Sequence, residues 1–163
     1  MTRHDAFALL REPRKLAFVC TGNTGRSVMA EALANVIIRE RQVEIAVSSR
    51  ALDLDPLETR PEAHVVRLLA ERGIDVAAHR SVPFSAGDAR HADVILTMTG
   101  KQKARLIELF PEARARTFTL SEYATGESAE VTDAWGQPLP VYVDLLKQLD
   151  ALVPAALHRL ASE

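Results

Sequence analysis

The chain has 163 residues, of which 47% are hydrophobic and 26% charged, and this balance suits one globular domain with a buried core. The formal net charge of −2 argues against a surface that holds nucleic acid or anionic lipid. The single cysteine, Cys20, excludes an intrachain disulfide, and the Cys/His spacing of a structural zinc site is absent.

In chain order, the first apolar stretch, residues 6–10, is too short for a secretory signal or a membrane span, so we expect a cytoplasmic protein. Apolar runs bounded by turn residues predict strands over residues 15–20, 44–49, 93–98 and 116–120. Apolar positions at helical spacing predict helices over residues 27–42, 61–72, 101–110 and 138–160. Segments 50–60 and 122–136 should be surface loops, and Pro154 should kink or break the last helix.

This alternation of strands and helices predicts an α/β fold: a three-layer sandwich with a four-stranded parallel sheet flanked by helices. We expect one domain over residues 1–163, of which residues 1–14 form an N-terminal extension. In such a fold the ligand lies at the carboxyl ends of the strands.

A glycine-rich stretch joins the first strand to the first helix. It reads Cys20-Thr21-Gly22-Asn23-Thr24-Gly25-Arg26-Ser27, and is called the phosphate loop below. Backbone N–H groups converge at such a junction and hold an oxyanion, and the two glycines let the backbone come close. The same partial positive charge favours a thiolate at Cys20, while Arg26 offers a fork for two phosphate oxygens and Ser27 can cap the helix and donate to the sulfur. These residues predict a phosphate site with a cysteine nucleophile.

The loop resembles that of the low-molecular-weight protein-tyrosine-phosphatase family, which reads Cys-x-Gly-Asn-x-Cys-Arg-Ser near the N-terminus. The resemblance runs from about Lys15 to the C-terminus. It includes Gly73-Ile74-Asp75 with His79-Arg80, Ala92-Asp93-Val94-Ile95 with Met98-Thr99, and Phe110-Pro111. It implies the fold of that family and hydrolysis of phosphotyrosine or phosphoarginine in proteins through a phosphocysteine, without a metal or cofactor. The implied partner is a phosphorylated protein, with no nucleic acid or membrane, and the oligomeric state stays open.

The resemblance also implies roles outside the loop. Asp133 stands where the family has its general acid, although Ala134 replaces the proline that usually follows. Trp135 would line the mouth of the pocket, and Ser49 and His79 would support the loop asparagine. From the residues alone, each of these three has an alternative without a functional role. Asp133 could be a solvated aspartate of a surface loop, Trp135 could be a packing residue, and His79 could be a surface histidine.

Three departures from the family pattern stand out. Gly25 occupies the place of the second loop cysteine, Val28 replaces the proline that opens the helix, and Arg50 belongs to a pair of residues that is usually small. Without a neighbouring thiol, Cys20 cannot be protected as a disulfide inside the loop. We therefore expect oxidation to pass beyond the sulfenic acid more readily.

Two other functions stay open. An arsenate reductase shares the fold and loop but shuttles a disulfide between further cysteines, so one cysteine leaves it dependent on an external thiol. A phosphate-binding module would keep the anion site without turnover, and Arg50 and Ala134 leave room for that outcome.

The choice of substrate rests mainly on Thr24. A threonine at this place resembles the bacterial protein-arginine-phosphatase branch, as does the stretch Phe118 to Gly126, whereas tyrosine-directed members tend to have a larger aliphatic residue. A β-branched side chain keeps its hydroxyl in few rotamers, so that hydroxyl could orient water. Acidic residues follow Ser49, at positions 53, 55 and 58, and could hold a guanidinium. They could equally be a solvated edge, so both substrates stay open and Thr24 favours phosphoarginine.

Overall fold

The computed structural model describes residues 12–163. Its four strands are β1 (Arg14–Cys20), β2 (Ile45–Ala51), β3 (Val94–Thr97) and β4 (Thr117–Thr119). All of their pairings are parallel, in the order β2-β1-β3-β4. The helices are α2 (Arg26–Arg41), α3 (Ala63–Ala70), α4 (Ala86–His91), α5 (Gly100–Leu109), η1 (Pro111–Arg116, a 3-10 helix), α6 (Leu120–Thr125) and α7 (Leu139–Ser162). The predicted α/β sandwich with a four-stranded parallel sheet is confirmed.

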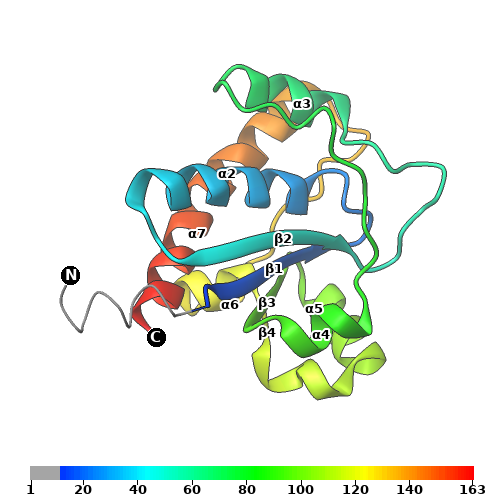
Figure 1. Ribbon diagram of the computed structural model, residues 1–163. Coiled ribbons are helices and arrows are strands. Elements are labelled where there is room, and N and C mark those ends of the chain that lie inside the picture. The colour runs from blue at the N-terminus through cyan, green and yellow to red at the C-terminus, as the bar shows by residue number, and fades with distance from the viewer. Residues whose placement is uncertain (1–11) are drawn as a thin grey trace.

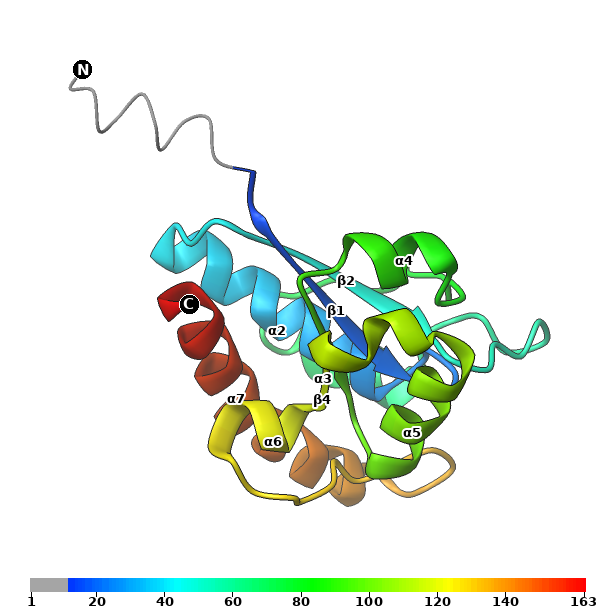
Figure 2. The ribbon, with the colours of Figure 1, turned by 90° about the horizontal axis from the view of Figure 1, so that it is seen from below.

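The sheet lies between two layers of helices. Figure 1 shows α2, α3 and α7 on one side of it, and Figure 2 shows α4 and α5 on the other. Because side chains alternate along a strand, β1 serves both layers: Leu16 and Phe18 belong to the cluster with α2 and α7, while Ala17 and Val19 belong to the cluster with α4 and α5. This burial on both faces explains why the strand reads as a continuous apolar run.

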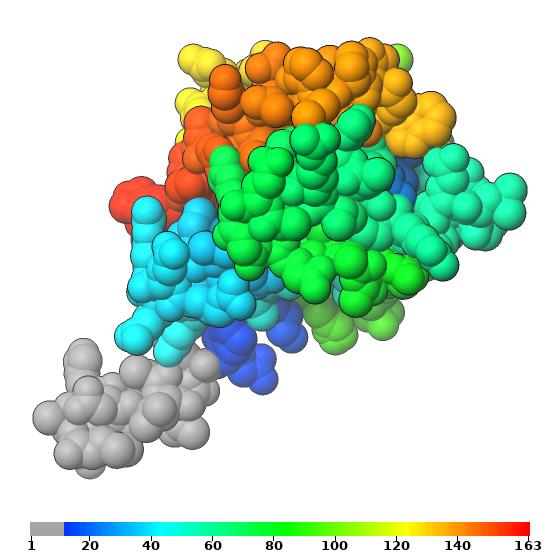
Figure 3. Space-filling view, turned by 90° about the horizontal axis from the view of Figure 1, so that it is seen from above, coloured from blue at the N-terminus to red at the C-terminus, as the bar shows by residue number. Residues whose placement is uncertain are grey.

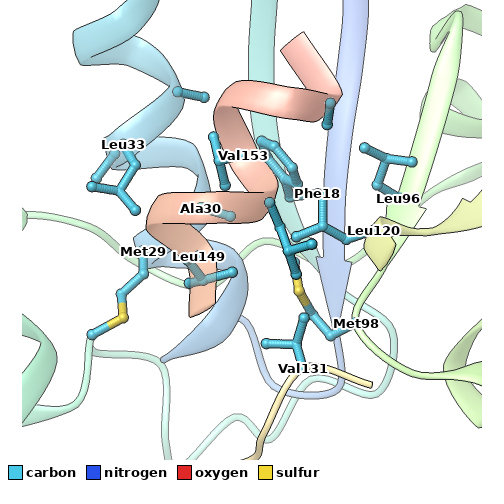
Figure 4. Packing of buried hydrophobic residues seen from close by; sticks show 14 of the residues in the cluster. Phe18, Met29, Ala30, Leu33, Leu96, Met98, Leu120, Val131, Leu149 and Val153 are labelled. Carbon is cyan, nitrogen blue, oxygen red and sulfur yellow. The ribbon is translucent and has the colours of Figure 1, made fainter. Parts of the chain in front are cut away.

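The larger of the two clusters fixes the start of α2 against the sheet. Figure 4 shows Phe18 of β1 beside Val153 of α7, and the same cluster contains Met29 and Leu33 of α2 and Leu149 of α7. All five side chains are at most 7% exposed. Burial of each contributes roughly 1.5–3 kcal/mol, so the junction between β1 and α2 rests on a rigid base.

The segment 122–136 is only partly a loop, because α6 runs to Thr125. Thr119 and Glu122 form a capping box at the start of this helix, and Gly126, with φ of 78°, ends it. The sequence carries the Thr-x-x-Glu signal of such a box. Another box, at Ser85 and Asp88, starts α4, a helix that the apolar spacing did not predict.

Two further expectations need correction. β2 runs on to Ala51, into the segment expected as a loop, because Arg50 and Ala51 still pair with β1. Pro154 does not break α7, which continues to Ser162. A proline inside a helix costs about 3 kcal/mol. Buried residues on both sides of it, such as Leu149 and Leu157, offset that cost.

The N-terminal extension expected over residues 1–14 falls, up to residue 11, outside the described residues. Within the described part β1 already begins at Arg14, so the boundary of the domain stays a prediction. Across residues 12–163 no helix combines the length and the hydropathy needed to cross a bilayer.

Candidate active site

The phosphate loop leaves β1 at Cys20 and enters α2 at Arg26, at the carboxyl edge of the sheet. From β1 the chain passes first to β2 on one side, whereas β3 and β4 lie on the other side. A ligand site is expected at such a switch point of a parallel sheet. In Figure 3 the blue loop segment lies in a hollow between the orange segment near residue 135 and the teal segment near residue 55.

Cys20 lies at the base of this hollow with two potential donors on its sulfur. Ser27 Oγ is 2.9 Å from Cys20 Sγ, and the Asn23 N–H donates to the sulfur over 3.3 Å. Both groups can stabilise a thiolate. Ser27 does not cap the helix, because α2 begins at Arg26 with Gly25 as a cap residue that makes no side-chain bond. The Ser27 hydroxyl is instead turned to the sulfur.

Asn23 braces the loop from inside. It is fully buried, and its φ of 55° lies in the left-handed region that asparagine tolerates. Its side chain donates to Ser27 Oγ (2.8 Å) and accepts from the Val82 N–H (3.1 Å). Its carbonyl oxygen accepts from Ser81 Oγ (2.9 Å) and His79 Nε2 (3.0 Å). The expected support by His79 therefore reaches the backbone of the asparagine.

The structure gives the Ser49 hydroxyl a different hydrogen-bond partner from the expected Asn23. Ser49 is buried, but its hydroxyl donates to Glu31 Oε1 of α2 over 3.1 Å. A carboxylate is a stronger acceptor than an amide oxygen, and the Asn23 amide oxygen accepts from the Val82 N–H. Ser49 thus ties β2 to α2.

Arg26 and Asp133 meet at the wall of the hollow. Arg26 Nη1 donates to the Val131 carbonyl (3.3 Å), and Arg26 Nη2 lies 3.7 Å from Asp133 Oδ2. The other carboxylate oxygen of Asp133 accepts from the Trp135 N–H (3.1 Å). The Asp133 side chain is 64% exposed and that of Arg26 only 9%. The two residues that the sequence analysis placed at the reaction therefore lie together, although they are far apart in the sequence.

The hollow is a pocket of about 190 Å³ with an acidic wall. From the phosphate loop it is lined by Cys20, Thr21, Gly22, Thr24, Gly25 and Arg26. Its carboxylates are those of Asp53, Asp55, Glu58, Glu62 and Asp133. Trp135 also lines it and is 58% exposed, so it is not packed under the loop.

Asp53 is paired with an arginine outside the phosphate loop, Arg105. Two hydrogen bonds of 3.0 and 2.9 Å join the guanidinium to its carboxylate. The Arg105 hydrogen bond holds the pKa of Asp53 below its ordinary value. Of the three acidic residues at positions 53, 55 and 58, Asp53 is the one whose charge is balanced by an arginine.

Sequence reasoning missed Glu62, which joins the loop to α7. Its Oε2 accepts from Thr24 Oγ1 over 2.9 Å, and its Oε1 accepts from the Tyr142 hydroxyl. Burial first, and the hydrogen bond to Glu62 next, raise the pKa of Tyr142. No spacing in the sequence indicates these contacts, since Thr24 and Tyr142 are distant from Glu62 along the chain.

Gln102 is a second residue that the sequence did not single out. Its amide nitrogen donates to Thr21 Oγ1 over 3.1 Å. Its amide oxygen accepts from the N–H groups of Met98 and Thr99 at the end of β3 (2.9 and 3.1 Å). Gln102 therefore fixes the outer side of the phosphate loop to the neighbouring strand.

A parallel α/β sandwich with a cysteine and an arginine on the loop at its switch point is the arrangement of a cysteine-dependent phosphatase. The chain matches the family model described as low molecular weight phosphotyrosine protein phosphatase over residues 15–163. It therefore belongs to this family, as the resemblance implied.

Two curated relatives differ in the substrate they are named for. The protein-arginine-phosphatase of Geobacillus stearothermophilus is 34% identical over 157 residues, 93% of this chain and 99% of that protein. The low molecular weight protein-tyrosine-phosphatase PtpB of Staphylococcus aureus is 35% identical over 143 residues, 85% of this chain and 94% of that protein.

Solved structures agree with this membership. A mutant of YwlE from Bacillus subtilis superposes with a TM-score of 0.85 at 33% identity, covering 90% of this chain and 98% of that one. A second structure is of a YwlE arginine phosphatase whose active-site cysteine is replaced by serine, and that serine is phosphorylated. It superposes with a TM-score of 0.85 at 32% identity, covering 90% of this chain and 95% of that one. That phosphoserine supports a mechanism with a phosphorylated nucleophile, and this chain is a cysteine-based protein phosphatase.

Proposed function

We propose that the chain hydrolyses phosphoarginine in proteins in preference to phosphotyrosine, with the residues of the phosphate loop and Asp133 as its machinery. The observation that carries the proposal is the Thr24 side chain on the wall of an acidic pocket whose base holds Cys20. The relative from Geobacillus stearothermophilus, named as an arginine phosphatase, supports it.

In the first step Cys20 Sγ attacks phosphorus as a thiolate, in line with the leaving group. The S–P bond forms and the P–N bond of phosphoarginine breaks, while Asp133 gives its proton to the leaving nitrogen. Arg26 and the N–H groups of the loop hold the phosphoryl oxygens, whose charge is greatest in the transition state. For this step the Arg26 guanidinium turns its fork from Asp133 to the phosphoryl group.

In the second step water attacks the phosphocysteine. Asp133, now a carboxylate, takes a proton from that water, the new P–O bond forms, and Cys20 leaves as a thiolate. Ser27 Oγ and the Asn23 N–H, both already at the sulfur, stabilise the charge that returns to it. The products are inorganic phosphate and the free arginine side chain.

The acidic wall favours a guanidinium substrate over a phenyl one. A guanidinium carries N–H donors in a plane and pairs with carboxylates, whereas a phenyl ring offers them no partner. Asp55 and Glu58 face the same pocket as the loop, and Asp133 lies opposite Arg26. Trp135 supplies an apolar wall that suits either substrate.

The test compares kcat/KM on matched peptides that differ only in phosphoarginine or phosphotyrosine. The native chain should prefer phosphoarginine, and Thr24→Ile should shift the ratio toward phosphotyrosine. Thr24→Val keeps the branched shape and removes only the hydroxyl. It therefore separates the effect of the lost hydroxyl from the effect of the larger side chain in Thr24→Ile. A native preference for phosphotyrosine contradicts the proposal, and an unchanged ratio in Thr24→Ile removes Thr24 from it.

We further propose that the protein acts on phosphorylated proteins in the bacterial cytoplasm. The relatives named above come from bacteria. A reducing compartment also keeps a lone thiol such as Cys20 available as a nucleophile. Cell fractionation with an antibody against the chain tests this, and recovery outside the cytoplasmic fraction contradicts it.

A further inference from the structure

We propose that Glu62 is a positioning residue, which makes the Thr24 hydroxyl a hydrogen-bond acceptor toward the substrate and so selects phosphoarginine. This inference rests on the proposed function. It adds a residue outside the phosphate loop to the machinery and states how the threonine discriminates between the two substrates.

Two hydrogen bonds tie Glu62 to Thr24. The side-chain carboxylate accepts from Thr24 Oγ1 over 2.9 Å, and the Glu62 N–H donates to the Thr24 carbonyl over 2.9 Å. Backbone and side chain of the threonine are thus held by one residue. Both residues line the pocket above Cys20, so the contact lies where the substrate must bind.

The carboxylate itself is held in place from the other side. Its second oxygen accepts from the Tyr142 hydroxyl, and the Tyr142 side chain is buried, at 3% exposure. Because burial and this hydrogen bond raise the pKa of Tyr142, its hydroxyl stays a donor at neutral pH. With both oxygens engaged, the Glu62 side chain has little freedom to turn away from Thr24.

The absence of a side chain at Gly25 leaves space for the Glu62 carboxylate. A Cβ atom at this position would lie 2.3 Å from Glu62 Oε2, which is far inside van der Waals contact. Any larger residue there, cysteine included, must move the Glu62 carboxylate from the position in which it accepts from Thr24. The glycine in place of a second loop cysteine and the contact between Glu62 and Thr24 therefore depend on each other in this chain.

The direction of the hydroxyl decides what it can recognise. A hydroxyl has one proton and two lone pairs. Since its proton is given to Glu62, Thr24 Oγ1 offers only lone pairs to the pocket. Phosphoarginine has an N–H on the nitrogen bonded to phosphorus and further N–H groups beside it, whereas the bridging oxygen of phosphotyrosine has no hydrogen. A hydroxyl freed from Glu62 could instead donate to a phosphoryl oxygen, which both substrates share.

A double-mutant cycle tests this coupling. Glu62→Met removes the acceptor at nearly the same length, and Thr24→Val removes the hydroxyl. The readout is the ratio of kcat/KM on the matched phosphoarginine and phosphotyrosine peptides. Glu62→Met should lower this ratio by about threefold to tenfold, the value of one hydrogen bond. In the Thr24→Val background the same substitution should leave the ratio unchanged.

Glu58→Met is the matched control, because it removes a carboxylate from the same pocket wall that has no side-chain bond to Thr24. Any effect of this variant on the ratio should persist in the Thr24→Val background. If Glu62→Met fails to fold, Glu62→Met combined with Tyr142→Phe replaces it, since no buried hydroxyl is then left unpaired.

The outcomes separate the two proposals. A native chain that prefers phosphotyrosine contradicts the proposed function. A native chain that prefers phosphoarginine, with a Glu62→Met effect that is absent or equally large in the Thr24→Val background, overturns the role of Glu62 alone. Equal losses on both peptides, with an unchanged ratio, assign Glu62 a structural role and overturn the inference as well.

Discussion

Asn23→Ala should weaken the phosphate loop by an amount that follows from its contacts. The side chain makes a buried hydrogen bond with Ser27 and a partly buried one with Val82, and each contributes about 1 kcal/mol net. The φ of 55° places the backbone where alanine costs about 1 kcal/mol more than asparagine. The free energy of unfolding should therefore fall by about 3 kcal/mol, and Tm by about 6 to 12 °C for a chain of this length.

Asn23→Gly separates the two contributions. Glycine adopts the left-handed region without steric cost, so only the lost hydrogen bonds, about 2 kcal/mol, should remain. Thermal unfolding followed by circular dichroism in phosphate-free buffer should rank the native chain above Asn23→Gly and Asn23→Ala below both. A Tm of Asn23→Ala equal to that of the native chain would refute the bracing role, and one equal to that of Asn23→Gly would refute the backbone contribution.

Three further changes test the chemistry and the stability. Cys20→Ser should fold and lose hydrolysis by several orders of magnitude, since a serine hydroxyl stays protonated there; near-normal turnover contradicts the mechanism, and a native chain without turnover indicates a binding module. Asp133→Asn should cost about 10²–10⁴-fold with a poor leaving group and much less with a good one, whereas equal losses indicate a structural role. The hydrogen bond from Lys103, and next that from the Thr119 N–H, lower the pKa of Glu122. The ionised Glu122 therefore stabilises the folded state above about pH 4, and this stabilisation is lost as the pH falls through the lowered pKa. Glu122→Gln should thus lower Tm at pH 7, with a gap to the native chain that closes on acidification; a constant gap contradicts the linkage.

The sheet and the phosphate loop could be predicted because their signals are local. β1 is buried on both faces and reads as an apolar run, and the glycines after it mark a turn into α2. The short helices α4 and α6 were missed because a single capping box, and not an apolar periodicity, marks each of them. The helix-breaking effect of Pro154 was overestimated because tertiary packing holds α7 together on both sides of this residue.

Contacts between distant parts of the chain were beyond sequence reasoning. Ser49 donates to Glu31 because of the position of α2 over β2. No local sequence pattern determines that position. Glu62 reaches the loop only because the segment before α3 folds across it. Cys20 and Arg26, which line one pocket with Asp133, could be proposed from eight consecutive residues, and Asp133 only through the family resemblance.

The presence of a single cysteine, placed in the pocket, has a practical consequence. Cys20 is the only cysteine of the chain and lines the pocket at its base. Because Cys20 is buried, at 3% exposure, a thiol reagent must enter the pocket to reach it and labels at most one position per molecule. An anion seated in the loop shields the sulfur, so the rate of labelling measures occupancy by ligands that carry no chromophore. The protein thus contains its own probe for inhibitor screening.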